Sequence, residues 1–138
     1  MAAALAAERA TEEEIAHLRR ILDDMEPYVQ QGDDRKLTEA SFEFHRQLYS
    51  ILGNRFLIDF LTTLAEQLRR YRSLQFKIPH RGRLSVEEDR CILEAIARHD
   101  VEAAERCAQE HVNRLWAHAE PYVRKALAAS KPSAAGQQ

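Results

Sequence analysis

The stretch that decides the fold is residues 41–54, which read SFEFHRQLYSILGN. If this stretch and the turn before it are helical, mainly apolar residues at three- and four-residue spacing form one stripe along the helix. Such a stripe is typical of a helix face that packs against a core. That stripe consists of Leu37, Ser41, Phe44, Leu48 and Ile51. Ser41 and His45 lie one helical turn apart on or beside the stripe, where polar side chains need partners. Gly53 and Asn54 end the helix, because both tolerate a positive φ.

The same three-four spacing recurs on both sides of this stretch. Capping boxes are predicted at Thr11 with Glu14 and at Ser85 with Glu88. Pro27 is expected to bend or end its helix near residue 26. The predicted fold class is all-α, an antiparallel helical bundle of about six helices with a truncated first helix. We expect helices over about residues 1–9, 11–26, 35–52, 55–72, 85–98 and 101–128, with a loop over 77–83.

Composition limits the function. A chain of 138 residues makes one domain with a real core. With 20 basic and 22 acidic residues, no basic excess indicates nucleic acid or a membrane surface. No stretch has the apolar length of a membrane span, and we expect a cytoplasmic protein. Cys91 and Cys107 are therefore interpreted as reduced thiols and not as a disulfide. Residues 130–138 are small and polar, which predicts a disordered tail.

Three expected helices each place a ligand-type residue on the inner stripe: His45, Asp89 and His111. Helical bundles build metal sites in this way, from side chains on facing helices. Two imidazoles and one carboxylate suit a divalent transition metal such as zinc, nickel, iron or manganese. The alternative for each residue alone is a hydrogen-bonded core position, and Asp89 could pair with Arg69 or Arg72.

The order and spacing of several short pieces resemble the FCD domain, the C-terminal ligand-binding domain of FadR-type regulators in the GntR family. The resemblance extends from Leu5 to about Tyr122. The pieces are residues 5–11, Phe44-His45 followed by Gly53-Asn54, then 87–96, 100–104 and 110–112.

This resemblance implies a bundle that holds a divalent metal, with a small organic acid bound at or beside it. The family's ligand positions fall on Ser41, His45, Asp89 and His111. His45 and His111 match, whereas Ser41 replaces an Asp and Asp89 replaces a His. The site could keep its charge with shifted geometry, or it could bind an effector directly without metal.

The resemblance also implies what the longer proteins contain. Family members carry an N-terminal winged helix-turn-helix that binds DNA, and this sequence has none, so residues 1–129 are expected to be the ligand-binding domain. Family members pair, so a homodimer is expected. Phe42, Tyr49 and Phe56 could supply an apolar pairing face, or could pack against other helices.

The leading functional hypothesis is a non-enzymatic effector sensor. A small carboxylate would enter near the three ligand-type residues, and Arg69 or Arg72 would neutralise it. Both arginines could instead be solvated residues of a helix end. Ser41 would donate a hydrogen bond to an effector oxygen. The alternatives are a metal-dependent enzyme with a two-His-one-carboxylate site and a purely structural dimerisation bundle.

Overall fold

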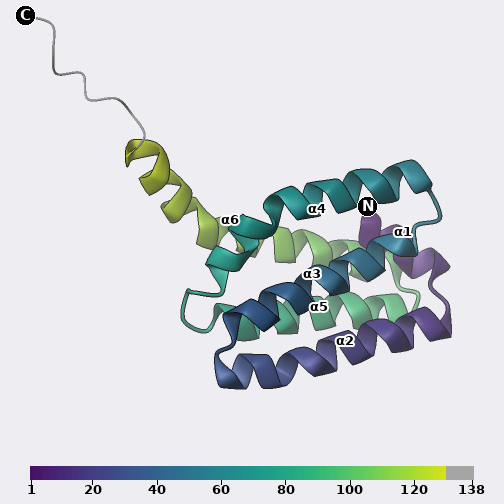
Figure 1. Cartoon of the computed structure of the whole chain (residues 1–138). Coiled ribbons are helices and arrows are strands. Elements are labelled where there is room, and N and C mark those ends of the chain that lie inside the picture. Colours follow the sequence, from purple (N-terminus) through teal and green to yellow (C-terminus); the bar gives the residue numbers. More distant parts are fainter. Residues whose placement is uncertain (130–138) are drawn as a thin grey trace, which may run out of the picture.

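Six α-helices make up the part of the chain that the computed structural model describes, residues 1–129 without the side chain of Arg70. They are α1 (Ala2–Arg9), α2 (Glu12–Gln31), α3 (Asp34–Ser50), α4 (Arg55–Gln75), α5 (Arg81–Ala97) and α6 (Val101–Ala129). Successive helices run antiparallel through short connections (Figure 1). Within the described range there is no strand, and the predicted all-α bundle is confirmed. The predicted tail, 130–138, lies outside the described residues.

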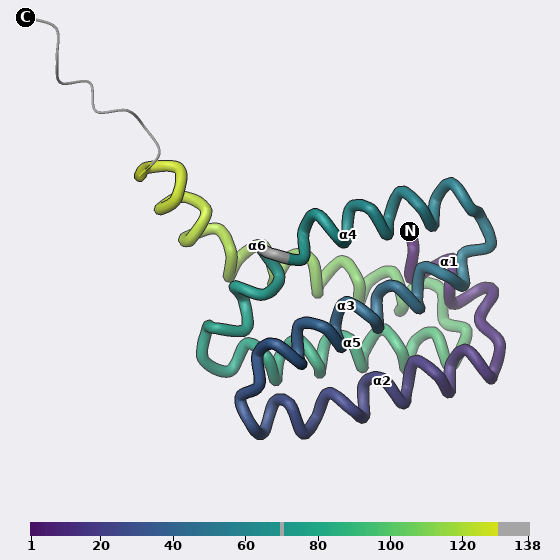
Figure 2. The backbone as a smooth tube through the Cα atoms, viewed as in Figure 1, coloured from purple at the N-terminus to yellow at the C-terminus, as the bar shows by residue number. Residues whose placement is uncertain are grey.

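The packing order can be followed along the backbone in Figure 2. The α5–α6 hairpin packs on the short α1, and α5 also packs on α2. Helix α3 lies between α2 and α4, while α4 has few contacts with α6. The predicted stripe of α3 faces this core, because Leu37, Phe44 and Leu48 are buried. The stripe's polar member, Ser41, is buried with them.

Local chemistry explains most helix ends. The predicted Thr11 capping box is confirmed: the Glu14 N–H donates to Thr11 Oγ1 at 3.2 Å, and the Thr11 N–H donates to Glu14 Oε2 at 2.8 Å. Gly53 follows α3 with a φ of 69°, a conformation that costs glycine little. Asn54 then caps α4 by accepting a hydrogen bond from the Leu57 N–H at 3.2 Å.

The predicted capping box at Ser85 is wrong. Helix α5 begins four residues earlier, at Arg81, directly after His80 with a φ of 65°. Ser85 and Glu88 are buried inside the helix, and the carboxylate of Glu88 binds the side chain of Arg81 instead of a helix end. The expected loop over residues 77–83 is correspondingly shorter.

Of the two outcomes expected at Pro27, a bend or an end of the helix, the end does not occur, because α2 continues through Pro27 to Gln31. A proline inside a helix removes its own N–H bond and crowds the carbonyl four residues before it, and here the ring of Pro27 lies at the exposed surface. Met25, two residues earlier, is fully buried and anchors this part of α2 to the core. Gly32, with a φ of 65°, then ends the helix.

The α5–α6 hairpin turns at His99 and Asp100, so residues equally far from the turn face each other. Cys91 and Cys107 lie at such positions and form a disulfide with their Cα atoms 6.0 Å apart. The interpretation of these cysteines as reduced thiols is therefore wrong. Asp89 and His111 face each other in the same way, farther from the turn than the two cysteines. Each described helix is too short or too polar to cross a lipid bilayer.

Candidate functional site

The three predicted ligand residues meet inside the bundle. His45 comes from α3, Asp89 from α5 and His111 from α6, and each offers a ligand atom within 4.8 Å of those of the other two. The side chains are almost inaccessible, with exposed fractions of 6%, 0% and 5%. His45 Nε2 lies 3.6 Å from Asp89 Oδ1, and His111 Nδ1 lies 3.9 Å from the same oxygen. The helical periodicity and the hairpin register together bring these groups to one point.

The ring of His45 is oriented by the main chain of its own helix. Its Nδ1 lies 2.8 Å from the carbonyl oxygen of Ser41. Because a carbonyl only accepts, Nδ1 carries the proton and Nε2 keeps its lone pair for the interior. Burial lowers the pKa of His45 well below its usual value, and the nearby charge of Arg72 lowers it further. A neutral imidazole with a free nitrogen is the form that binds a metal.

Asp89 is a carboxylate whose charge has no direct partner. Among the residues that the structure describes, neither of its oxygens has a hydrogen-bond partner, although both are buried. Burial raises the pKa of Asp89 to about 6. An uncompensated buried carboxylate costs several kcal/mol, roughly, and a divalent cation would remove that cost. The two imidazoles beside it complete a nitrogen and oxygen donor set that fits such an ion.

Two further residues of this site, Glu88 and Arg81, were not predicted from the sequence. Glu88 Oε2 accepts a hydrogen bond from His111 Nδ1 at 2.7 Å. Arg81, which is fully buried, binds the same carboxylate through both of its terminal nitrogens at 2.9 and 3.1 Å. Burial favours a raised pKa for Glu88, but the hydrogen bonds from His111 and Arg81 outweigh it and hold the pKa below its usual value. The sequence signal that could have indicated Glu88 is its position next to Asp89, on the same turn of α5.

The structure separates the two candidate arginines. Arg72 lines the cavity beside His45 and His111, and its charge lowers the pKa of both His45 and Asp89. Its Nε is buried, and no partner for it exists in the described part of the chain. Arg69 is exposed and lies over the ring of Phe42, 5.4 Å from the ring centre. Arg72 therefore belongs to the site by position, and Arg69 does not.

A cavity of about 240 Å³ opens beside the two imidazoles. Helices α1, α3, α4, α5 and α6 all contribute to its wall. The lining residues are Met1, Ala2, Ala3, His45, Leu48, Tyr49, Arg72, Ile92, Glu105, Ala108, Gln109, His111 and Val112. Ser41 is not among them, and its contribution to the site is the main-chain oxygen that orients His45. The cavity is mainly apolar, with a few polar groups in its wall, as small-molecule sites commonly are.

A larger hollow of about 520 Å³ lies at the end of the bundle, between the α2–α3 turn and the α4–α5 connection. Its charged residues include Arg83, which already pairs with Glu26 at 2.8 Å. His80 contributes to the wall, but it is exposed and belongs to a loop. This hollow contains no described cluster of metal-ligating side chains comparable to the one at Asp89.

Comparison with known proteins identifies the family of this chain. The family model of the FCD domain matches residues 1–114, which is most of the chain. The chain therefore belongs to the FCD domain family, and the resemblance found in the sequence is confirmed.

Two curated relatives are transcription regulators by name. The HTH-type transcriptional repressor NanR of Cronobacter sakazakii is 28% identical over 114 residues, which cover 81% of this chain and 43% of that protein. The uncharacterized HTH-type transcriptional regulator YdhC of Bacillus subtilis is 27% identical over 119 residues, which cover 86% of this chain and 53% of that protein. The chain thus spans about half the length of these curated relatives.

Proposed function

We propose that this FCD domain is the effector-sensing part of a transcription regulator, and that it binds a small organic acid beside a divalent transition metal. His45, Asp89 and His111 would hold the metal. The observation that carries the proposal is the carboxylate of Asp89, buried without a hydrogen-bond partner in the described structure and flanked by two imidazoles. A polar group in this state is rare in folded proteins, and a bound ion is one of the few arrangements that stabilise it.

The donor set supports a transition metal and leaves room for a further ligand. Three protein donors occupy only part of the coordination shell of zinc, nickel, iron or manganese, so water or an acid oxygen can complete it. The family resemblance implies an Asp at position 41 and a His at position 89. Here the carboxylate is on α5 instead of α3, so the site keeps one negative charge and changes its geometry.

Arg72 supports a carboxylate as the effector. It lies on the wall of the cavity, and its Nε has no partner among the described groups. A guanidinium binds a carboxylate through two parallel hydrogen bonds, which favours an organic acid over a neutral ligand. The apolar part of the wall, including Leu48, Ile92 and Val112, would accept the carbon skeleton of such an acid.

The experiment is titration calorimetry, first with zinc, nickel, iron(II) and manganese salts and then with a panel of small organic acids, with and without chelator. We expect His45→Ala and His111→Ala to abolish metal binding, with His118→Ala as the matched control on α6. We expect Arg72→Gln to weaken acid binding at least tenfold and Arg69→Gln to leave it unchanged. Metal and acid binding that survive both histidine substitutions would reject this site.

Effector binding would act on DNA through a DNA-binding domain of the kind for which the HTH-type relatives are named. Helices α3, α4, α5 and α6 all border the cavity, so a ligand that prefers one packing of these helices would shift their equilibrium. The ligand must bind the two arrangements with different affinity for regulation to result.

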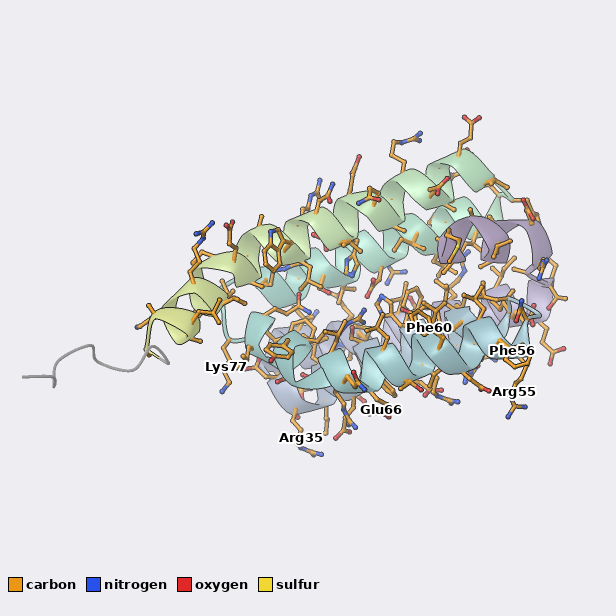
Figure 3. The ribbon with its side chains drawn as sticks, turned by 90° about the horizontal axis from the view of Figure 1, so that it is seen from above. Arg35, Arg55, Phe56, Phe60, Glu66 and Lys77 are labelled. Carbon is orange, nitrogen blue, oxygen red and sulfur yellow. A yellow bond between two sulfur atoms is a disulfide. The ribbon has the colours of Figure 1, made fainter. Side chains whose placement is uncertain are left out.

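The proposal includes a homodimer, formed through α4. Among the predicted pairing residues, Phe42 and Tyr49 are half-buried and only Phe56 is strongly exposed, at 89%. Figure 3 shows Phe56 and Phe60 on α4, at the edge of the bundle. Exposed apolar residues continue along this helix at three- and four-residue spacing: Phe56, Phe60, Leu64, Leu68, Tyr71 and Leu74. A stripe of this length is typical of a pairing surface.

Sedimentation tests the pairing. We expect a particle of twice the 15.9 kDa chain mass, which Phe60→Glu converts to the monomer, whereas Glu66→Gln on the same helix leaves the dimer intact. A wild-type chain that sediments as a monomer at all concentrations would refute this part of the proposal.

Of the two alternatives, the purely structural bundle is disfavoured by the open cavity and by the charged and polar side chains in its otherwise apolar wall. A metal-dependent enzyme would use the same three donors as the sensor. Conversion of a bound acid by the metal-loaded protein would favour the enzyme, and an acid that is recovered unchanged would favour the sensor.

A further inference from the structure

Glu88 and Arg81 form a buried ion pair beneath the candidate metal site. Both oxygens of Glu88 accept hydrogen bonds from Arg81, and Oε2 also accepts the one from His111 Nδ1. Both side chains are buried, with exposed fractions of 5% for Glu88 and 0% for Arg81. Buried guanidinium and carboxylate groups in this two-bond geometry are held firmly in place.

This pair determines which nitrogen of His111 carries a proton. The Glu88 carboxylate, held by the permanently charged guanidinium, can only accept a hydrogen bond. Nδ1 of His111 must therefore be the donor, which leaves the lone pair on Nε2. The ring of His111 lies 5.6 Å from the ring of His45 and 28° from parallel to it, so the two imidazoles are already aligned.

We propose that Glu88, braced by Arg81, is a positioning residue that fixes His111 as the Nδ1–H tautomer and so presents Nε2 to the metal. The proposal rests on the proposed metal site. Histidine ligands of metals commonly donate their second ring N–H to a carboxylate, which sets both tautomer and orientation. His45 obtains the same result from the main-chain oxygen of Ser41, which no side-chain substitution removes.

The two adjacent carboxylates of α5 thus have different tasks. The charge of Glu88 is already paired: Arg81 donates to both of its oxygens, His111 donates to Oε2, and Arg114 Nη1 lies 3.8 Å from Oε1. Asp89 lacks a hydrogen-bond partner in the described structure and is free to bind a metal. This division explains how neighbouring acidic residues can serve one site without competing for the same ion.

The test reads the tautomer in the metal-free protein. Long-range ¹H–¹⁵N NMR of histidine-labelled protein, with His111→Gln to assign the signals, is expected to show an unprotonated Nε2 for His111. Glu88→Gln also removes the charge that pairs with Arg81; where this variant folds, its amide oxygen can still accept the hydrogen bond, and we expect it to keep this tautomer. Glu87→Gln, an exposed neighbour, is the control and should change nothing.

Removal of Glu88 alone would leave the charge of Arg81 buried and could unfold the chain. The decisive variant is therefore the double substitution Arg81→Met with Glu88→Leu, which removes both charges at similar volume. We expect it to fold, to populate both tautomers of His111, and to bind zinc about 10- to 100-fold more weakly in competition with a chromophoric chelator.

Two results would overturn the proposal: an Nε2–H tautomer in the wild-type protein, or a folded double variant with the wild-type tautomer and wild-type zinc affinity. Failure of the wild-type protein to bind zinc would count against the metal site itself. Because the tautomer is read without metal, the two failures can be told apart.

Discussion

His45 and His111 come from different helices, and their rings stack with centres 5.6 Å apart and planes 28° from parallel. In each ring Nδ1 faces a fixed acceptor, the Ser41 carbonyl oxygen for His45 and the Glu88 carboxylate for His111. In the neutral form of each ring, the lone pair is therefore on Nε2. The alignment exists before any ligand binds, which reduces the cost of ordering a site when an ion enters.

The first prediction concerns pH and Asp89 in metal-free protein. Burial raises the pKa of Asp89 from 3.8 to about 6, so the folded state binds more protons than the unfolded state between these values. This contribution therefore destabilises the protein as the pH rises from about 4 to about 6, by about 3 kcal/mol in total. Urea unfolding with chelator, compared with Asp89→Asn, measures it, because other groups cancel in the difference.

We expect Asp89→Asn to be the more stable of the two proteins above pH 6 without metal, and the order to reverse when zinc is added. If the two stability curves run parallel from pH 4 to pH 7, the carboxylate of Asp89 is not isolated in the way the structure indicates.

The second prediction returns the carboxylate to the position that the family resemblance implies. Ser41→Asp together with Asp89→His would place one carboxylate and three imidazoles at the site, and we expect zinc to bind at least as tightly as in the wild type. Ser41→Asp alone leaves two carboxylates in one buried site, so we expect it to destabilise the metal-free protein. Calorimetry measures zinc binding by the double variant, and thermal unfolding with chelator measures the stability of Ser41→Asp. A double variant that has lost zinc binding would show that the backbone around Asp89 fits only the shorter side chain.

The third prediction uses two glycines with nearly the same backbone conformation. Gly53 and Gly32 have φ values of 69° and 65°, but a Cβ on Gly53 would lie 3.0 Å from Arg9 Nη1 and one on Gly32 would meet nothing within 4 Å. Gly32→Ala is expected to cost about 1–2 kcal/mol through the backbone alone. Gly53→Ala should cost more, because Arg9 also donates a hydrogen bond to the Leu52 carbonyl oxygen and must move. Equal losses in urea unfolding would mean that Arg9 adapts freely.

Periodicity was sufficient to predict the bundle and the meeting of His45, Asp89 and His111. Each residue lies on the inner face of its own helix. The antiparallel hairpin of α5 and α6 then places Asp89 and His111 at the same level along the bundle. Arg69 and Arg72 are only one turn apart, and the sequence could not say which of them faces the cavity. The choice depends on how α4 is rotated against α3, which is decided by packing along the whole helix.

Glu88 and Arg81 show why the rest of the site was missed. The spacing of Ser85 and Glu88 fits a capping box, and the pattern reads the same whether the serine begins a helix or lies within one. The helix begins earlier, at Arg81, and the buried Arg81 pairs at 2.9 Å with the carboxylate of Glu88, two turns along. A local pattern does not contain this long-range requirement.

The last prediction concerns the disulfide, which was not predicted from the sequence because a cytoplasmic protein was expected to keep its thiols reduced. Cys91 and Cys107 close a loop with a sequence separation of 16, beside the helix segments that carry Asp89 and His111. A loop of this size constrains the unfolded chain, so Cys91→Ser with Cys107→Ser is expected to lower the free energy of unfolding by about 3 kcal/mol. Urea unfolding measures the loss, and adding dithiothreitol should lower the wild type to the level of the variant while leaving the variant unchanged. A wild type that is indifferent to the reductant would mean that the two thiols do not pair in solution.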